Sequence, residues 1–339
     1  MTLRLKLTIG SIVVILLANA LLSLVIVGYL ERTSLKEVQN RVQLDLNSAQ
    51  ASYAHHIESI ARYLTAASLD DALAATLKQP EHRQGRDRKV HLFRAGEIDF
   101  LTLLDAQGRT VFRPRNPSRR GDDQSQNPLV QAVLETRQLA SGTILLPRQR
   151  LVDEGEDLAA RTDFEIRPTP SAPTGEPLSQ REGMVAEAAA PILGPDGNLL
   201  GVLVAGNVLD RRYALVDGIR EQVFPETRDH AGQRGNVTIF RGDLRIATNV
   251  IQDDGSRAVG TRMSSDVFQR VLVEGSAWSA PAFVVHDWYI TAYEPIRDPR
   301  QRVIGALYVG LLRAPFLHRQ NVVTAVILLA ALVATVGCL

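Results

Sequence analysis

Two groups of side chains in this sequence have the chemistry to bind a small anion. The first follows an apolar run in the N-terminal half, where Arg113 and Arg115 come shortly before Asp122. Because the planar guanidinium of arginine forms paired hydrogen bonds to carboxylates and phosphates, this group suits an anionic ligand. The alternative is a solvated loop whose opposite charges pair with each other at little net gain. We take Arg113, Arg115 and Asp122 as ligand-binding candidates.

The second group centres on the segment HDWYITAY in the C-terminal half. Alternation along a strand places Tyr289, Thr291 and Tyr293 on one face, which should meet the helices of its domain. Tyrosine hydroxyls beside an arginine can hold a small anion in a pocket. The alternative is an aromatic core whose hydroxyls bond to the backbone. The candidates in this second group are Arg245, Thr248, His286, Tyr289, Thr291 and Tyr293.

No stretch of the sequence carries a motif for catalysis or cofactor binding. G-x-S-x-G, H-E-x-x-H, the phosphate loop and the kinase nucleotide-binding box are all absent, which disfavours a secreted hydrolase. The only cysteine is Cys338, so an intramolecular disulfide and a cysteine-based metal site are excluded. The net charge of +1 provides no overall field for a polyanion. We predict no catalytic residue, no metal, no cofactor and no nucleic-acid partner.

Two similar segments, Pro191–Gly206 and Pro295–Gly310, indicate an internal repeat. Each has an apolar run, a proline-bearing turn and a second run ending on glycine, which predicts a β-hairpin. Because one hairpin cannot bury an apolar face alone, each should complete its own small sheet. We therefore predict two tandem α+β domains with antiparallel sheets, over residues 81–218 and 219–316.

Uncharged apolar runs lie near both ends of the sequence, at residues 7–30 and 320–339. Each is long enough to cross a hydrocarbon core of about 30 Å as a helix. Basic residues before the first run favour a cytoplasmic N-terminus, which places residues 31–319 outside the cytoplasm. A cleaved signal peptide is the alternative for the first run, but cleavage after the small-x-small triplet at 18–20 would leave an exposed apolar end.

A long helix is predicted between the first apolar run and the domains. Apolar residues recur every three or four positions from Leu35 to Ala67, with no proline or glycine before Pro80. This pattern predicts a stalk helix over residues 31–80. Its apolar seam could pack on the chain's own domains or on a second chain as a coiled coil. We expect a homodimer formed through the stalk and the membrane helices.

Several segments together resemble a known family. They are VFRPRNPSRRGDD and NPLVQAVLET in the first domain, and TIFRGDLRIATNV, GTRM, WYITAYEPI and VIGALYVG in the second. The combination resembles double-Cache sensors of the Cache-three/Cache-two fusion type, found in bacterial chemoreceptors and sensor histidine kinases. The resemblance implies a membrane-distal and a membrane-proximal PAS-like domain that bind a small molecule and shift the membrane helices. The amino-acid-binding signature of some relatives, a tyrosine followed by an Arg-x-Trp-Tyr cluster, is absent, so an amino-acid ligand is not supported.

These observations favour the ligand-sensing part of a bacterial inner-membrane receptor with two membrane spans and a small, carboxylate-like ligand. Gly305, Gly310 and Arg313 connect the last predicted strands to the second span, so we predict that they transmit the signal. The long polar stretch 147–182, predicted as loop or insertion, makes the distal domain better suited to sensing. The alternative is a membrane protein that dimerises with another receptor and binds no ligand. Either a kinase or cyclase output domain follows beyond residue 339 or the receptor is a truncated one.

Overall fold

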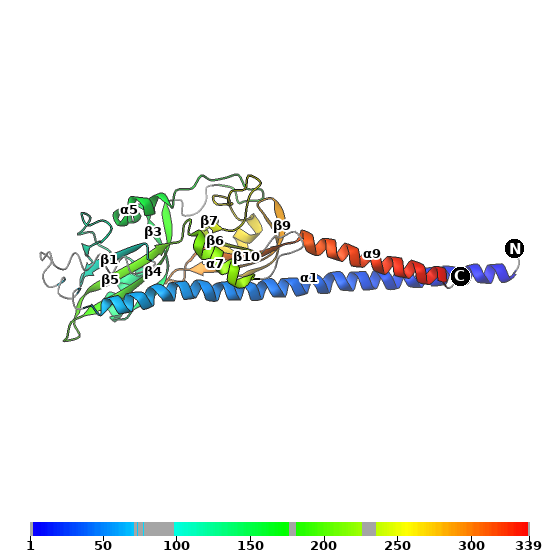
Figure 1. Ribbon diagram of the computed structural model, residues 1–339, viewed down its shortest axis with the longest axis horizontal. Helices are drawn as coiled ribbons and strands as arrows, with labels where there is room; N and C mark the ends of the chain where they lie inside the picture. The colour runs from blue at the N-terminus through cyan, green and yellow to red at the C-terminus, as the bar shows by residue number, and fades with distance from the viewer. Residues whose placement is uncertain are drawn as a thin grey trace.

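One long helix runs beside both sheets of the molecule (Figure 1). In the computed structural model, which describes residues 3–70, 73, 77, 98–175, 181–225 and 235–337, α1 spans Leu3–Ser68. Its apolar seam is buried on the chain's own units at positions such as Val42, Leu46 and Leu64. The structure thus favours packing of the stalk seam on the chain's own domains over packing on a second chain. The predicted continuation of the stalk to residue 80 falls mostly outside the described residues.

In its described residues, the first unit consists of an antiparallel sheet and three short helices. Its five strands have the order β2-β1-β5-β4-β3. They are β1 (Phe100–Asp105), β2 (Thr110–Phe112), β3 (Ala140–Pro147), β4 (Glu182–Leu193) and β5 (Leu199–Val208). The helices are α4 (Pro128–Thr136), α5 (Arg148–Glu154) and α6 (Glu156–Ala160). The stretch 147–182, predicted as loop or insertion, thus begins with two short helices, whose side chains Leu151 and Leu158 pack on the sheet.

The second unit repeats this strand order as β7-β6-β10-β9-β8. Its strands are β6 (Asn236–Arg241), β7 (Leu244–Thr248), β8 (Trp278–Val284), β9 (Asp287–Arg297) and β10 (Val303–Leu312). Helix α8 (Ser265–Phe268) continues into a π-helical turn, η1 (Gln269–Val273), and α7 (Tyr213–Val223) connects the two units. The two predicted hairpins are β4–β5 and β9–β10. The α+β class and the two antiparallel sheets are confirmed.

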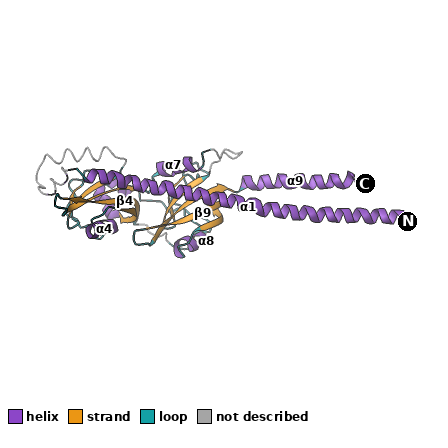
Figure 2. Ribbon diagram, turned by 90° about the horizontal axis from the view of Figure 1, so that it is seen from below, coloured by secondary structure: helices purple, strands orange, loops and turns teal. Residues whose placement is uncertain are grey.

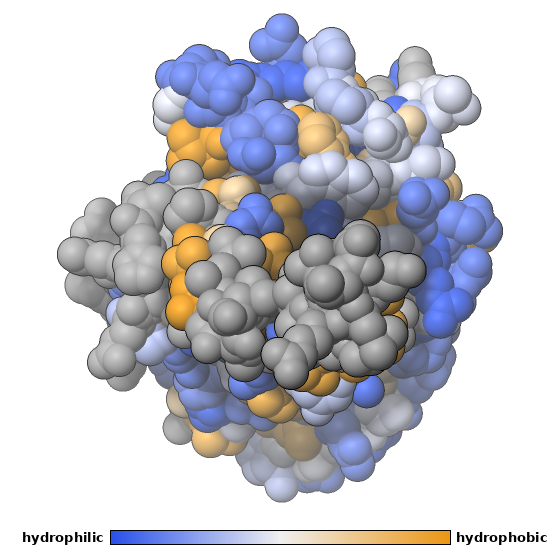
Figure 3. All heavy atoms as spheres, turned by 90° about the vertical axis from the view of Figure 1, so that its right-hand side faces the viewer, coloured by the Kyte–Doolittle hydropathy of each residue, from blue (hydrophilic) through white to orange (hydrophobic). Residues whose placement is uncertain are grey.

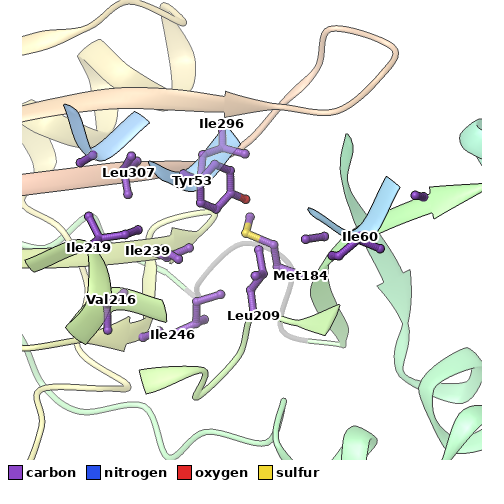
Figure 4. Packing of buried hydrophobic residues seen from close by; sticks show 14 of the residues in the cluster. Tyr53, Ile60, Met184, Leu209, Val216, Ile219, Ile239, Ile246, Ile296 and Leu307 are labelled. Carbon is purple, nitrogen blue, oxygen red and sulfur yellow. The ribbon is translucent and has the colours of Figure 1, made fainter. Parts of the chain in front are cut away.

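Each sheet separates two layers of apolar side chains. One face of each sheet packs on α1 in a shared core, to which α7 also contributes. This core includes Tyr53 and Ile60 of α1 together with Met184, Ile239 and Leu307 (Figure 4). The opposite face of the first sheet is covered by α4, α5 and α6, and that of the second sheet by α8 and η1. The candidate residues lie largely on these opposite faces.

Strand β10 leads directly to the last helix, α9 (Ala314–Gly337), which lies beside α1 (Figures 1 and 2). Apolar side chains such as Leu21, Leu24, Val326 and Leu329 are exposed on these two helices. The view from this end shows apolar patches in front of the largely hydrophilic units (Figure 3). Among the described residues, no helix meets the length and hydropathy required to span a membrane.

Candidate functional site

Arg113 in the first unit is buried in an internal network of ion pairs. Its side chain is fully buried and forms a bidentate pair with Asp122 at 2.6 and 2.7 Å. Its Nε also donates to Glu154 at 2.9 Å. Although burial opposes ionisation of Asp122, the hydrogen bonds and charge of Arg113 hold the pKa of Asp122 well below its usual range. The alternative of a solvated loop is therefore wrong about burial. As in that alternative, however, the opposite charges of the network pair with each other.

Arg115 is also paired within the chain. Its guanidinium contacts both carboxylate oxygens of Asp157 at 2.6 Å and donates to the backbone oxygen of Asp99 at 3.2 Å. All three candidates of the first unit thus have partners inside the unit. This arrangement favours a structural role for Arg113, Arg115 and Asp122 over ligand binding.

Two fully buried carboxylates of the first unit, Glu154 and Glu187, were not identified from the sequence. One oxygen of Glu154 accepts from Thr102, Arg113 and Arg150, whereas its other oxygen has no hydrogen-bond partner. Glu187 accepts from Asn127 at 2.5 Å, and its second oxygen is likewise unpartnered. Burial raises the pKa of Glu187 to about 7. Glu187 therefore changes charge near neutral pH in the folded protein.

The raised pKa of Glu187 predicts a pH dependence of stability. Because the folded state binds this proton more tightly than the unfolded state, the stability of the protein should fall as pH rises from about 4.5 to about 7. We expect Glu187→Gln to remove this part of the pH dependence, because the amide keeps the acceptor for Asn127 without a charge. At pH 8 the variant should be more stable by on the order of 3 kcal/mol.

Urea unfolding of both proteins between pH 4 and 8 measures this effect, with Glu58→Gln as the control at an exposed position. Parallel pH profiles for the wild type and Glu187→Gln would contradict the assignment.

Arg245 of β7 is a fully buried cation with few partners. Its guanidinium donates a hydrogen bond to the Thr261 hydroxyl, and Nε has no partner. The guanidinium lies 4.9 Å from the centre of the Phe240 ring. Burial lowers the pKa of Arg245, and no carboxylate in the described part of the chain is among the groups that oppose this shift. Arg245 therefore differs sharply from the paired Arg113.

Tyrosines from two adjacent strands surround Arg245. Tyr289 and Tyr293 project from β9 and Tyr308 projects from β10 into the same buried cluster. The rings of Tyr293 and Tyr308 are 4.8 Å apart, and the Tyr308 hydroxyl has no hydrogen-bond partner. Burial raises the pKa of both these hydroxyls, so they remain protonated donors. Tyr308 was not among the predicted residues, because alternation along β9 does not show which residue of β10 lies opposite. In the sheet, Tyr308 pairs with Tyr293.

The other candidates of the second unit have different partners. The Thr248 hydroxyl lies 2.6 Å from that of Thr238, and the Thr291 hydroxyl donates to Ala280 at 2.7 Å. His286 lies in the turn between β8 and β9, with its Nε2 3.4 Å from Asp287. The structure thus places Arg245 with Tyr289 and Tyr293. The hydroxyls of Thr248 and Thr291 are hydrogen-bonded elsewhere, and His286 lies beside Asp287 in the turn between β8 and β9.

This buried cluster has the chemistry of an anion-binding site. Burying a cation without a counterion costs several kcal/mol, and an anion beside it offsets that cost. The unpartnered Nε of Arg245 and the unpartnered hydroxyl of Tyr308 are both donors to a carboxylate oxygen. Within the described ranges, no group of three or more metal-ligating side chains is suited to hold a metal ion. A small anion is the class of molecule whose charge and acceptor oxygens would complement this cluster.

Comparison with known proteins finds one family model that matches part of the chain, from the end of β5 into α9. Residues 207–322 match the family model described as single Cache domain 3, which confirms the resemblance to Cache sensors over this part of the chain. No curated protein matches the chain.

Three bacterial domains are among the solved structures with a similar fold. The periplasmic domain of Vibrio cholerae LuxQ has 10% identity and a TM-score of 0.48, covering 80% of this chain and 99% of that one. The sensor domain of the V. cholerae histidine kinase DctB has 13% identity and a TM-score of 0.45, covering 82% and 98%. The ligand-binding domain of a Campylobacter jejuni chemoreceptor in complex with L-valine has 9% identity and a TM-score of 0.41, covering 85% and 96%.

Proposed function

We propose that this chain is the periplasmic sensing part of a bacterial transmembrane receptor and that its second unit binds a small carboxylate at Arg245. The observation that carries the proposal is a fully buried guanidinium without a carboxylate partner in the described part of the chain, beside the unpartnered Tyr308 hydroxyl. The match of residues 207–322 to a Cache family supports ligand binding in this same unit. The proposed ligand site thus lies in the second unit, whereas the insertion in the sequence had favoured the first.

The proposed signal passes from the Tyr308 hydroxyl to the end of β10. A Cβ atom at Gly310 would lie 2.1 Å from the hydroxyl oxygen of Tyr308, so the site directly contacts the transmission candidate Gly310. The next candidate, Arg313, donates its backbone N–H to Trp288 at 2.9 Å and immediately precedes α9. A ligand that prefers one position of Tyr308 would shift the population of α9 positions relative to α1.

In this proposal the apolar runs at 7–30 and 320–339 cross the inner membrane and residues 31–319 lie in the periplasm. The charge pattern and length of these runs support that topology. Homodimerisation also belongs to the proposal, and it would use the exposed face of α1 opposite the seam that packs on the sheets. The alternative protein that dimerises without a ligand predicts the same membrane topology but no response to small molecules.

A thermal-shift screen of the full chain in lipid nanodiscs tests ligand binding. Acetate, succinate, citrate and benzoate would be compared with chloride and with ethanolamine at matched ionic strength. A ligand at 100 times its Kd should stabilise the folded state by about 2.7 kcal/mol. We expect at least one carboxylate to raise the midpoint in the wild type but not in Arg245→Met.

The control is Arg270→Met, which removes a half-exposed arginine that pairs with Glu274 on the same unit. It should keep the response to the carboxylate. A midpoint that no carboxylate raises, or a response that survives in Arg245→Met, would reject the anion site and favour the non-binding alternative.

A further inference from the structure

A segment of the first unit extends along the second unit and reaches the neighbourhood of Arg245. We call residues 165–175, which follow α6, the strap. The strap joins the second unit through backbone and side-chain hydrogen bonds. They are Arg167 N–H to Gly260 O at 2.9 Å, Arg262 N–H to Thr169 Oγ1 at 3.0 Å and Ser265 N–H to Ser171 O at 2.7 Å. These bonds tie the strap to residues 260–265.

The strap backbone and the second unit are in direct contact at Gly260. This glycine has a φ of +83°, and a Cβ atom there would lie 2.2 Å from the backbone oxygen of Glu165. Only glycine has both the required backbone conformation and the space for this approach. The strap therefore packs closely on residue 260.

Arg262 makes the second firm connection. Its Nη1 donates to the backbone oxygens of Pro173 at 3.0 Å and Gly175 at 2.6 Å. Its Nε pairs with the buried Asp243 at 2.5 Å. One guanidinium thus links two strap residues to the turn between β6 and β7.

The residue between these two connections is Thr261, the hydrogen-bond partner of the Arg245 guanidinium. The Thr261 hydroxyl also donates to Ala258 O at 2.7 Å, which fixes its direction. In addition, the backbone N–H of Arg245 donates to Thr261 O at 2.9 Å, and Gly260 N–H donates to Arg245 O at 3.0 Å. Movement of residues 260–262 therefore moves the side chain that orients Arg245.

We infer that the strap positions Thr261, and through it Arg245, so that the first unit regulates anion binding in the second. Thr169 and Arg262 are positioning residues in this arrangement: Thr169 accepts from the backbone N–H of Arg262, which follows Thr261, and the Arg262 side chain holds the strap. Neither belongs to the proposed anion site. The inference rests on the proposed function for its ligand. The position of the Arg245 guanidinium, however, can be observed without any ligand.

The test uses the full chain in lipid nanodiscs with Thr169→Val, which removes the acceptor for Arg262 N–H. Acetate, the smallest carboxylate, is the probe for affinity, and the Nε–H resonance of Arg245, assigned by its loss in Arg245→Met, reports the guanidinium. We expect Thr169→Val to weaken acetate binding about three- to tenfold, the effect of one lost hydrogen bond, and to shift the Nε–H resonance. Thr169→Ser, which restores the hydroxyl, should recover both values.

Thr174→Val is the matched control, because it makes the same change at an exposed strap position. It should leave both measurements at wild-type values. Gly260→Ala, which displaces the strap backbone, should reproduce the effect of Thr169→Val. If the wild type does not bind acetate but the resonance still shifts in Thr169→Val, the anion proposal fails for acetate while the positioning role stands. If Thr169→Val and Gly260→Ala change only the thermal midpoint, with affinity and resonance unaltered, the positioning role is overturned.

Discussion

Replacing Arg113 by methionine is expected to lower the free energy of unfolding by about 3–5 kcal/mol, because it leaves buried Glu154 with one partner fewer and Asp122 without its bidentate partner. The same replacement at Arg245 should change that free energy by less than about 1 kcal/mol or increase it. No carboxylate among the described residues loses a partner there, and Thr261 keeps its bond to Ala258. The two substitutions are matched, since both arginines are fully buried.

Urea unfolding of the ligand-free full chain measures both changes. A large loss of stability at Arg113 with little change at Arg245 would show that Arg113 completes a network within the protein, whereas Arg245 does not. A gain of stability at Arg245 would show that this arginine is retained at a cost to stability. Such a cost is expected where a residue serves a ligand. Equal destabilisation by the two substitutions would mean that Arg245 has a structural counterion, and the proposed site would then lose its main support.

Replacing Gly305 by valine is expected to destabilise the protein by about 3 kcal/mol, at the upper end for overpacking. Gly305 of β10 pairs with Arg241 of β6. A Cβ atom at Gly305 would lie 2.0 Å from the backbone oxygen of Phe240 and 2.7 Å from Cε of Met184. The strand pair must therefore separate to accept any side chain. Loss of signalling in Gly305→Val would consequently report damage to the fold rather than a transmission role.

The control is Gly218→Ala in α7, where an added Cβ atom meets nothing within 4 Å. Alanine should stabilise this helix by about 0.5–1 kcal/mol. Urea unfolding of both variants checks the pair of expectations. A Gly305→Val protein with wild-type stability but without output would restore the transmission role that the sequence indicated for this glycine.

The repeat in the sequence predicted the second sheet well, because a hairpin is specified by residues that are close together in the sequence. A hairpin is specified by a turn and by alternation over a few residues on either side, and both copies have these features. The helical seam of α1 is similarly local. The insertion was predicted less well. Its two short helices are stabilised by contacts of Leu151 and Leu158 with a sheet formed from distant segments.

The sequence alone determined which chemical groups this protein has: several arginines beside apolar strands, tyrosines in alternation on β9, and no catalytic motif. It also determined the two antiparallel sheets. Only the tertiary structure decided which buried arginine lacks a carboxylate partner among the described residues. Pairing depends on residues far apart in the chain: Arg113 meets Glu154 from α5, whereas Arg245 meets Thr261 and the tyrosines of β9 and β10. Charge compensation of a buried arginine is thus a property of the assembled core, which local spacing does not specify.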